Sequence, residues 1–239
     1  MRFETRYTYD FIKRFLPSEC RRILEVGCGT GELAACLSND GYSVVAIDSD
    51  SDSVAAARRL RVDAHIATWP NFADRQFDAI LFTRSLHHIH PLAESIKHAA
   101  GSLVGAGLII VEDFAYESAD EKTLHWFVSA LRVLEATGML SADESLNKLL
   151  STTETLEVWR ENHEAELHTA AEIELQFEEV LDSVTREDAA YYFRYVANVI
   201  GATKKREAIL QAFAEQEAML AANGSIIGLG RRFVATRAG

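Results

Sequence analysis

The sequence predicts an α/β protein with a doubly wound, mostly parallel sheet and helices on both of its faces. Apolar, strand-like runs alternate with amphipathic helical runs over the first 111 residues. Such alternation implies parallel strands that are joined by crossover helices. The run Gly27-Cys28-Gly29-Thr30-Gly31 stands between the first predicted strand and the next helix. A turn of this composition lets a ligand approach the backbone and the amides of the helix start.

The predicted elements follow this alternation in order. We expect strands at 22–27, 42–47, 62–67, 77–82 and 108–111, with helices at about 7–16, 32–39, 54–60 and 92–102. After residue 111 the pattern changes to helices at 118–138, 153–166, 170–176, 189–200 and 203–222. Residues 177–184 are ambiguous and fit a sixth strand, and residues 225–235 are expected to be the last strand of a seven-stranded sheet.

Composition and charge narrow the possible partners. The chain has 24 lysines and arginines against 36 aspartates and glutamates, a net charge of −12. Binding to phosphates needs clustered Lys and Arg, so we expect no nucleic-acid partner. No apolar run approaches the ~20 residues of a membrane-spanning helix, and we expect no membrane partner. Cys20, Cys28 and Cys36 follow no CxxC spacing, which favours a reducing, cytoplasmic location.

The glycine-rich turn departs from the dinucleotide-binding pattern G-x-G-x-x-G. Its third glycine, Gly31, comes one position early, and Glu32 stands where that pattern requires glycine. Glu25 and Glu32 would also place negative charge beside a pyrophosphate, which is electrostatically unfavourable. These features disfavour a nicotinamide-dependent dehydrogenase and favour a ligand that carries positive charge.

The segment Glu25-Val26-Gly27-Cys28-Gly29-Thr30-Gly31 resembles the first motif of class I S-adenosylmethionine-dependent methyltransferases. Asp48, at the end of the second predicted strand, matches the acidic residue that binds the ribose hydroxyls in that family. Phe77-Asp78-Ala79-Ile80, followed by Ser85-Leu86-His87-His88-Ile89, resembles a later motif of its broad small-molecule branch. Leu103 to Glu112 resembles the motif and strand that come next. The resemblance covers about residues 20–114.

The resemblance implies a Rossmann-like core at 1–114 plus 223–239, which binds S-adenosyl-L-methionine. It also implies that the largely helical region 115–222, inserted between the fifth and last strands of the same domain, forms a lid over the acceptor. The residues expected to contact the cofactor are Glu25, Gly27, Cys28, Gly29, Gly31, Asp48, Ser49, Thr68, Trp69 and Thr83. Glu25 suits the positive charge of the methionine end, and Asp48 suits the ribose. The family usually has an aspartate after the third strand; here we expect Thr68 or a backbone amide to take the polar contact to adenine and Trp69 the stacking contact, the alternative for Trp69 being a packed loop aromatic.

The reaction that the resemblance implies is in-line transfer of a methyl group to an O, N or C nucleophile. A general base is needed where the nucleophile is a weak acid. The candidates are His88, Asp113, His125 and His163, with His168 close behind in the sequence. The histidines between 87 and 168 show no HExxH spacing, so we expect no metal site.

The predicted partner is a small-molecule acceptor of aromatic or hydrophobic character. The aromatic residues of the late region are the candidates to line its pocket: Phe114, Tyr116, Trp126, Trp159, Tyr191, Tyr192, Phe193 and Tyr195. More often such residues form the core of a domain. An alternative function is a non-catalytic assembly or regulatory subunit that keeps the cofactor site. We expect a monomer or a homodimer.

Overall fold

The computed structural model describes residues 1–74, 76–141, 144–163, 167–201 and 203–236. Contacts divide the chain into two compact units. The first, which we call the core unit, comprises Met1–Asp113, Ala170–Glu187 and Arg231–Gly239. The second, the helical unit, comprises Phe114–Thr169 and Asp188–Gly230. No described helix is both long enough and apolar enough to cross a membrane.

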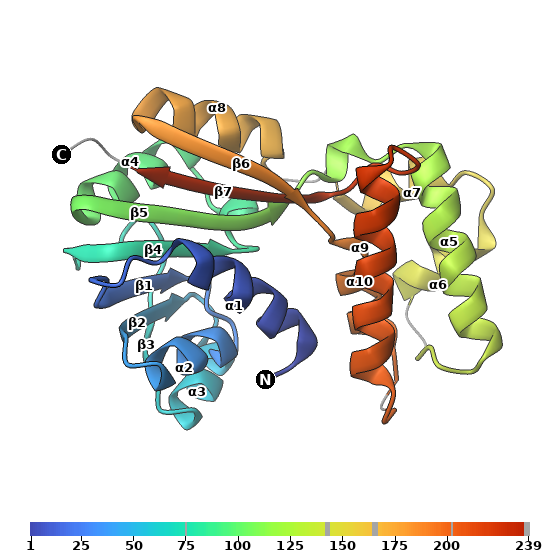
Figure 1. Cartoon of the computed structure of the whole chain (residues 1–239), viewed down its shortest axis with the longest axis horizontal. Helices are drawn as coiled ribbons and strands as arrows, with labels where there is room; N and C mark the ends of the chain where they lie inside the picture. The colour runs from blue at the N-terminus through green and yellow to red at the C-terminus, as the bar shows by residue number, and fades with distance from the viewer. Residues whose placement is uncertain (75, 142–143, 164–166, 202, 237–239) are drawn as a thin grey trace. The chain divides into compact units, whose positions relative to one another are not determined.

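Seven strands form one sheet in the order β3-β2-β1-β4-β5-β7-β6. Their bounds are β1 Arg22–Val26, β2 Ser43–Asp48, β3 Asp63–Ile66, β4 Phe77–Thr83, β5 Leu103–Phe114, β6 Ser183–Ala189 and β7 Gly230–Thr236. β1 pairs in parallel with β2 and β4, β2 with β3, and β4 with β5. Figure 1 shows β7 running in the opposite direction to β5. This mixed, mostly parallel sheet confirms the predicted fold class.

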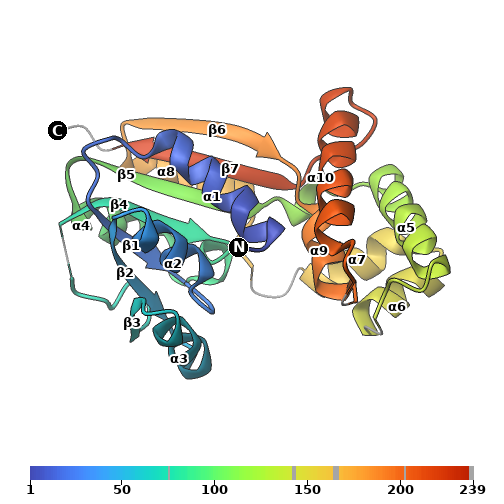
Figure 2. The ribbon, with the colours of Figure 1, turned by 60° about the horizontal axis from the view of Figure 1, so that its bottom comes forward.

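Two apolar clusters cover the two faces of the sheet. The helices α1 (Phe3–Phe15), α2 (Glu32–Asn39) and α3 (Ser51–Arg59) pack on one face. The helices α4 (Leu92–Ser102) and α8 (Ala170–Val180) pack on the other. Figures 1 and 2 show these two groups on opposite sides of the strands. Strands that are covered on both faces are apolar throughout, which is why the runs in β1, β2 and β4 are readable from sequence.

The sixth strand lies later in the chain than the sequence suggests. Residues 177–180 are the end of α8, and β6 begins only at Ser183. β6 is an edge strand, and its side chains are exposed or half-buried. An edge strand commonly carries charged residues, and the charged run Arg186-Glu187-Asp188 does not show the apolar pattern by which a strand is predicted. The last strand also starts later than predicted, at Gly230.

The helical unit contains five α-helices among its described residues. They are α5 Glu121–Ala136, α6 Glu144–Ser151, α7 Thr155–His163, α9 Tyr192–Val199 and α10 Arg206–Ala222, preceded by the short 3₁₀ turn η2 at Tyr116–Ser118. The sequence does not predict α6. The helix expected at 153–166 corresponds to α7, and its last three residues, 164–166, lie outside the described residues.

A buried carboxylate holds the start of α9. Glu217 of α10 is fully buried, and its Oε1 accepts hydrogen bonds from the N–H groups of Tyr191 at 2.5 Å and Tyr192 at 3.0 Å. Its Oε2 accepts a third bond, from the Phe193 N–H at 3.3 Å. Burial raises the pKa of Glu217 to about 7. The residue before α9, Tyr191, provides no side-chain cap, so Glu217 takes over that role.

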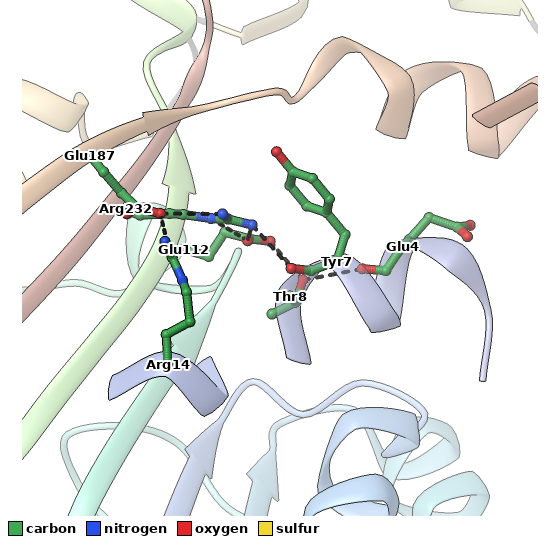
Figure 3. Close-up of polar contacts among 7 residues, drawn as sticks. All are labelled: Glu4, Tyr7, Thr8, Arg14, Glu112, Glu187 and Arg232. Carbon is green, nitrogen blue, oxygen red and sulfur yellow. Dashed lines mark hydrogen bonds and ion pairs between the residues drawn. The ribbon is translucent and has the colours of Figure 1, made fainter. Parts of the chain in front are cut away.

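Within the core unit, a buried ion pair fixes α1 on the sheet (Figure 3). Arg232 of β7 donates from Nε and Nη2 to Glu112 Oε2 of β5, at 2.9 and 2.7 Å. The hydroxyl of Thr8 in α1 donates to the other oxygen of Glu112 at 2.7 Å. The guanidinium of Arg232 also lies over the rings of Tyr7 and Phe11. Both oxygens of a buried carboxylate are therefore satisfied, and α1 supplies part of their partners.

Candidate active site

The glycine-rich turn joins the carboxyl end of β1 to the start of α2. Gly27 and Gly31 have left-handed backbones, with φ of 74° and 76°. A Cβ on Gly27 would lie 2.4 Å from the Cβ of Ser85, and one on Gly31 would lie 2.5 Å from the Cβ of Ala57. Close packing and backbone conformation therefore both require glycine at these two positions. A Cβ on Gly29 would meet nothing within 4 Å, so the open side of the turn is at Gly29.

Asp48 ends β2 beside this turn, and backbone amides fix its carboxylate. Its Oδ2 accepts a hydrogen bond from the Gly29 N–H at 2.8 Å, and its Oδ1 accepts one from the Asp50 N–H at 2.9 Å. A carboxylate has about four lone-pair sites, so each oxygen of Asp48 keeps one for a ligand. Asp50, not Ser49, is the residue that caps α3. Asp48 is thus held in one orientation at a sheet edge where ligands bind in this class of fold.

A cavity of about 610 Å³ is bordered by the ends of β1, β2 and β4 and by the segments that follow β3 and β4. Its lining is Val26, Gly27, Ile47, Asp48, Ser49, Ala67, Thr68, Trp69, Asn71, Arg84, Ser85, His88, Ile89 and His90. Five of the residues predicted to contact a cofactor are in this lining: Gly27, Asp48, Ser49, Thr68 and Trp69. The other five, Glu25, Cys28, Gly29, Gly31 and Thr83, are not. The cavity thus brings together the predicted residues of three separate sequence segments.

Glu25 lies in β1 and is only 1% exposed. Its Oε1 accepts a hydrogen bond from the Thr83 hydroxyl at 3.3 Å, whereas its buried Oε2 has no hydrogen-bond partner among the described residues. Burial raises the pKa of Glu25 to about 8, and the bond from Thr83 and the positive charge of Arg84 oppose that rise. A buried acid with a free oxygen suits a cationic group, because unpaired buried carboxylates are strongly unfavourable.

Two of the predicted cofactor contacts have structural partners of their own. The Cys28 side chain is buried beside the Gly29 carbonyl, and burial raises the pKa of its thiol to about 12. Cys28 is therefore a neutral thiol rather than a nucleophile. The indole N–H of Trp69 donates to the Ser95 carbonyl at 3.1 Å, and the ring packs in the core beneath the cavity. A stacking role for Trp69 stays a prediction, and its polar edge is already occupied.

The segment after β4 contains the short 3₁₀ turn η1 (Leu86–His88) and carries the first predicted base. His88 lines the cavity with an exposed ring, 4.1 Å from the ring of His87. Desolvation at the cavity wall and the charge of His87 lower the pKa of His88. His87 itself is buried, and its Nδ1 lies 2.5 Å from Oδ1 of Asp113. His88 is thus a neutral imidazole that is accessible from the cavity.

Asp113, which the sequence predicts as a candidate base, is not accessible from the cavity. It lies inside β5, fully buried, and does not line the cavity. Its two oxygens contact the ring and the backbone N–H of His87, the latter at 3.2 Å. In this structure Asp113 therefore positions the segment that carries His88.

The remaining predicted bases belong to the helical unit. His125 lies exposed on α5 and lines neither the cavity described above nor a second cavity between α5 and α10 (Arg206–Ala222). His163 stacks on Trp159 with ring centroids 4.1 Å apart, which confirms that the two residues share a helix face. Its Nδ1 lies 2.7 Å from the Trp159 carbonyl, so this nitrogen carries the proton. Its Nε2 then accepts from the Tyr195 hydroxyl at 2.9 Å. A catalytic role for His125 or His163 stays a prediction.

The aromatic residues of the helical unit mostly pack on one another. Phe114 stacks on Tyr191 with ring centroids 4.7 Å apart, and the ring centroids of Phe127 and Tyr192 are 4.9 Å apart. The second cavity, of about 670 Å³, lies within this unit between α5 and α10. Of the aromatic residues predicted to line an acceptor pocket, Trp126 alone lines this cavity. Most of the others are buried, as expected for a core.

Two residues that line the first cavity, Asn71 and Arg84, are not indicated by the sequence analysis. Arg84 directly follows β4, and ligands bind at the carboxyl ends of parallel strands in such sheets. That position in the sequence is a signal by which Arg84 could have been found. No group of three or more His, Cys, Asp or Glu side chains that could hold a metal ion occurs in the described part of the chain.

The family model described as a methyltransferase domain matches residues 2–179. The chain belongs to this family. The match includes the glycine-rich turn, Asp48 and the segment of His88, so the methyltransferase family spans the residues that border the first cavity.

Curated relatives of this methyltransferase domain match over a shorter range. An uncharacterized methyltransferase of Staphylococcus carnosus is 32% identical over 105 residues, which are 42% of this chain and 51% of that protein. A ubiquinone biosynthesis O-methyltransferase of Hydrogenovibrio crunogenus is 33% identical over 107 residues, 41% of this chain and 44% of that protein. The match with such relatives therefore spans about half of their length or less.

Solved structures share the fold over nearly the whole chain. Phosphoethanolamine N-methyltransferase 2 of Haemonchus contortus, in complex with S-adenosyl-L-methionine, aligns with a TM-score of 0.62 at 13% identity. The alignment covers 98% of this chain and 53% of that one. The plantazolicin methyltransferase BpumL aligns with a TM-score of 0.55 at 14% identity, and covers 98% and 82%. At these identities the likeness concerns the fold.

Proposed function

We propose that this chain is an S-adenosylmethionine-dependent methyltransferase that acts on a small molecule. The observation that carries the proposal is the carboxylate of Asp48, which two backbone amides hold at the edge of the cavity beside the open side of the glycine-rich turn. Membership of the methyltransferase family supports the same reading. Of the structural neighbours named above, one is a complex with S-adenosyl-L-methionine and the other a complex with SAH.

The residues of the core unit fit the parts of the cofactor. Asp48 would accept the ribose hydroxyls, because each of its oxygens keeps a lone pair. Glu25 would complement the ammonium of the methionine end, directly or through a water, because its Oε2 is buried without a partner in the described structure. Thr68 and the ring of Trp69 would contact the adenine. Ser49 lines the cavity next to Asp48 and would contact the nucleoside.

When bound, the cofactor supplies an electrophilic methyl group on a sulfonium. The chain then has to orient the acceptor and, for a weakly acidic nucleophile, remove its proton. His88 is the predicted base that lines the cavity, and its lowered pKa keeps it neutral and able to accept a proton. Asp113 would act on His88 only indirectly, through His87.

The acceptor is proposed to be a small aromatic or hydrophobic molecule, with the helical unit as its lid. The support is the aromatic content of the helical unit and its position in the chain between β5 and β7. We further propose a cytoplasmic location, because all three cysteines are free thiols.

The test begins with S-adenosylhomocysteine, titrated into the wild type, Asp48→Ala and Asp52→Ala by calorimetry. Asp48→Ala should weaken binding by roughly 2 kcal/mol, since it removes charge-assisted hydrogen bonds. Asp52, in the first turn of α3 and outside the cavity, provides a matched change of charge and should bind like the wild type. A wild type that binds NAD but not S-adenosylhomocysteine would overturn the proposal. Cofactor binding without transfer to a broad panel of acceptors would favour a non-catalytic subunit instead.

A further inference from the structure

Arg84 is the exception in an otherwise buried segment. From Ala79 to His87, all of which the structure describes, every residue is buried except Arg84. Its backbone is left-handed, with φ of 59°, a conformation that residues other than glycine seldom adopt. Such a conformation persists only where the surroundings impose it, and it is frequent at ligand sites.

The contacts on both sides of Arg84 impose this conformation. The N–H of Arg84 donates to the Glu112 carbonyl of β5 at 2.7 Å. The hydroxyl of Ser85 donates to the Val26 carbonyl of β1 at 2.6 Å, and His87 is held by Asp113. The segment is therefore anchored to β1 and β5, and Arg84 remains at the edge of the cavity that it lines.

The charge of Arg84 is available to a ligand. Its guanidinium makes no hydrogen bond or ion pair with any described residue, unlike the guanidinium of Arg232. Its positive charge is nevertheless close enough to Glu25 to lower the pKa of that acid. Arg84 thus lines the cavity, and its charge lowers the pKa of Glu25. Both observations indicate that its guanidinium lies at the methionine end of the proposed cofactor site. The net charge of the chain is −12, so a positive charge at the edge of the cavity is opposite in sign to the charge of the whole chain.

We propose that Arg84 is the anion-binding residue of this cavity and that its ligand is a carboxylate. A guanidinium presents its donors as a fork that matches a carboxylate with two parallel hydrogen bonds. Two sources of that group are compatible with its position. One is the α-carboxylate of the cofactor, since Glu25 and Arg84 together would complement an amino-acid zwitterion. The other is a carboxylate of the acceptor, which would make the substrate an acidic small molecule.

This inference rests on the proposed function, and its test distinguishes failure of the inference from failure of the proposed function. The probes are S-adenosylhomocysteine, methylthioadenosine, which lacks the amino-acid part, and succinate. Calorimetry compares the wild type with Arg84→Gln and Arg61→Gln. Arg61 is a matched control, because it is also an exposed arginine with a left-handed backbone, φ 65°, and it does not line the cavity.

If the cofactor supplies the carboxylate, Arg84→Gln weakens S-adenosylhomocysteine by about 10- to 100-fold, as for loss of a charged hydrogen bond, and leaves methylthioadenosine unchanged. If the acceptor supplies it, S-adenosylhomocysteine binds as before, and succinate binds the cofactor-loaded wild type but not the cofactor-loaded variant. Arg61→Gln should behave as the wild type in both arms. An Arg84→Gln variant equal to the wild type with all three probes overturns the inference. A wild type that does not bind S-adenosylhomocysteine overturns the proposed function instead.

Discussion

Glu25 and Glu112 are two carboxylates buried in strands of the same sheet, exposed by 1% and 2%, with opposite surroundings. Glu112 has Arg232 on one oxygen and Thr8 on the other. Glu25 has a longer bond from Thr83, and its second oxygen has no hydrogen-bond partner in the described structure. The chain therefore completes the environment of Glu112 by itself and leaves that of Glu25 incomplete.

The difference separates a structural charge from a functional one. Burying a carboxylate is costly unless a cation and hydrogen bonds compensate it. At Glu112 the compensation comes from β7 and α1, so the pair belongs to the fold. At Glu25 no ion pair provides it and the compensation is incomplete, and the acid lies in β1 close to the glycine-rich turn. We infer that Glu25 receives its counter-charge from a ligand, and four variants test this contrast.

The largest effect is expected for Arg232→Met. It leaves Glu112 buried without its cation, and breaking such a pair from one side lowers the free energy of unfolding by about 3–5 kcal/mol. Urea unfolding measures the loss. The double variant Glu112→Gln, Arg232→Met removes both charges and should regain most of the stability. A double variant as unstable as the single one would contradict the view that the stranded charge is the cause.

Glu25→Gln should lower the affinity for the cofactor without lowering the stability of the fold. The variant cannot ionise when the cofactor ammonium binds, so S-adenosylhomocysteine should bind about 10- to 100-fold more weakly, as for other charged hydrogen bonds. At pH 7 the wild-type Glu25 is mostly protonated, because its pKa is about 8. Glutamine has nearly the shape of the protonated acid but cannot ionise in the unfolded state, so at pH 7 the variant should be more stable than the wild type, by at most about 1.4 kcal/mol for each pH unit above 4.5. Equal affinities of variant and wild type would remove Glu25 from the cofactor site.

The pH dependence of stability gives a third comparison. The pKa of Glu25 is raised from 4.5 to about 8 in the folded protein, so the folded state binds an additional proton between these values. Stability should therefore fall as pH rises from about 5 to 8, by at most about 1.4 kcal/mol per pH unit. The measurement is the difference in unfolding free energy between the wild type and Glu25→Gln across that range, without cofactor. A difference that is constant with pH would mean that Glu25 is ionised throughout.

The same contrast shows what the sequence could reveal. Glu25, the glycines and Asp48 belong to one local pattern of a strand, a turn and a strand end, and their spacing is readable. The partners of Glu112 are not, because Arg232 lies 120 residues away along the chain. Nothing in the sequence marks Thr8 as the partner of a buried acid. The polar edge strand β6 is not recognisable in the sequence for a related reason, since its side chains lack the apolar pattern of the inner strands.

In the candidate site, residue type and location were predictable, but partners were not. Asp113 was a predicted base because it follows an apolar run, yet β5 continues through Phe114 and buries it against His87. Arg84 was not indicated, because its left-handed backbone results from bonds to β1 and β5 that only the folded sheet supplies. Spacing predicts which side chains reach the sheet edge, and tertiary contacts decide which of them remain available to a ligand.

The smallest effect is expected at a third carboxylate, Glu32, which also accepts several hydrogen bonds from the start of α1. Its partners are the backbone N–H and Nε of Arg2 and the hydroxyl of Thr5. The number of donors resembles that at Glu112, but the side chains of Arg2 and Glu32 are 59% and 24% exposed. Water can replace the guanidinium here, so Arg2→Ala should cost less than about 1 kcal/mol of unfolding free energy. Salt should reduce even that loss, because exposed charges are screened. A cost comparable to that of Arg232→Met, unchanged by added sodium chloride, would show that burial is not what distinguishes the two carboxylates.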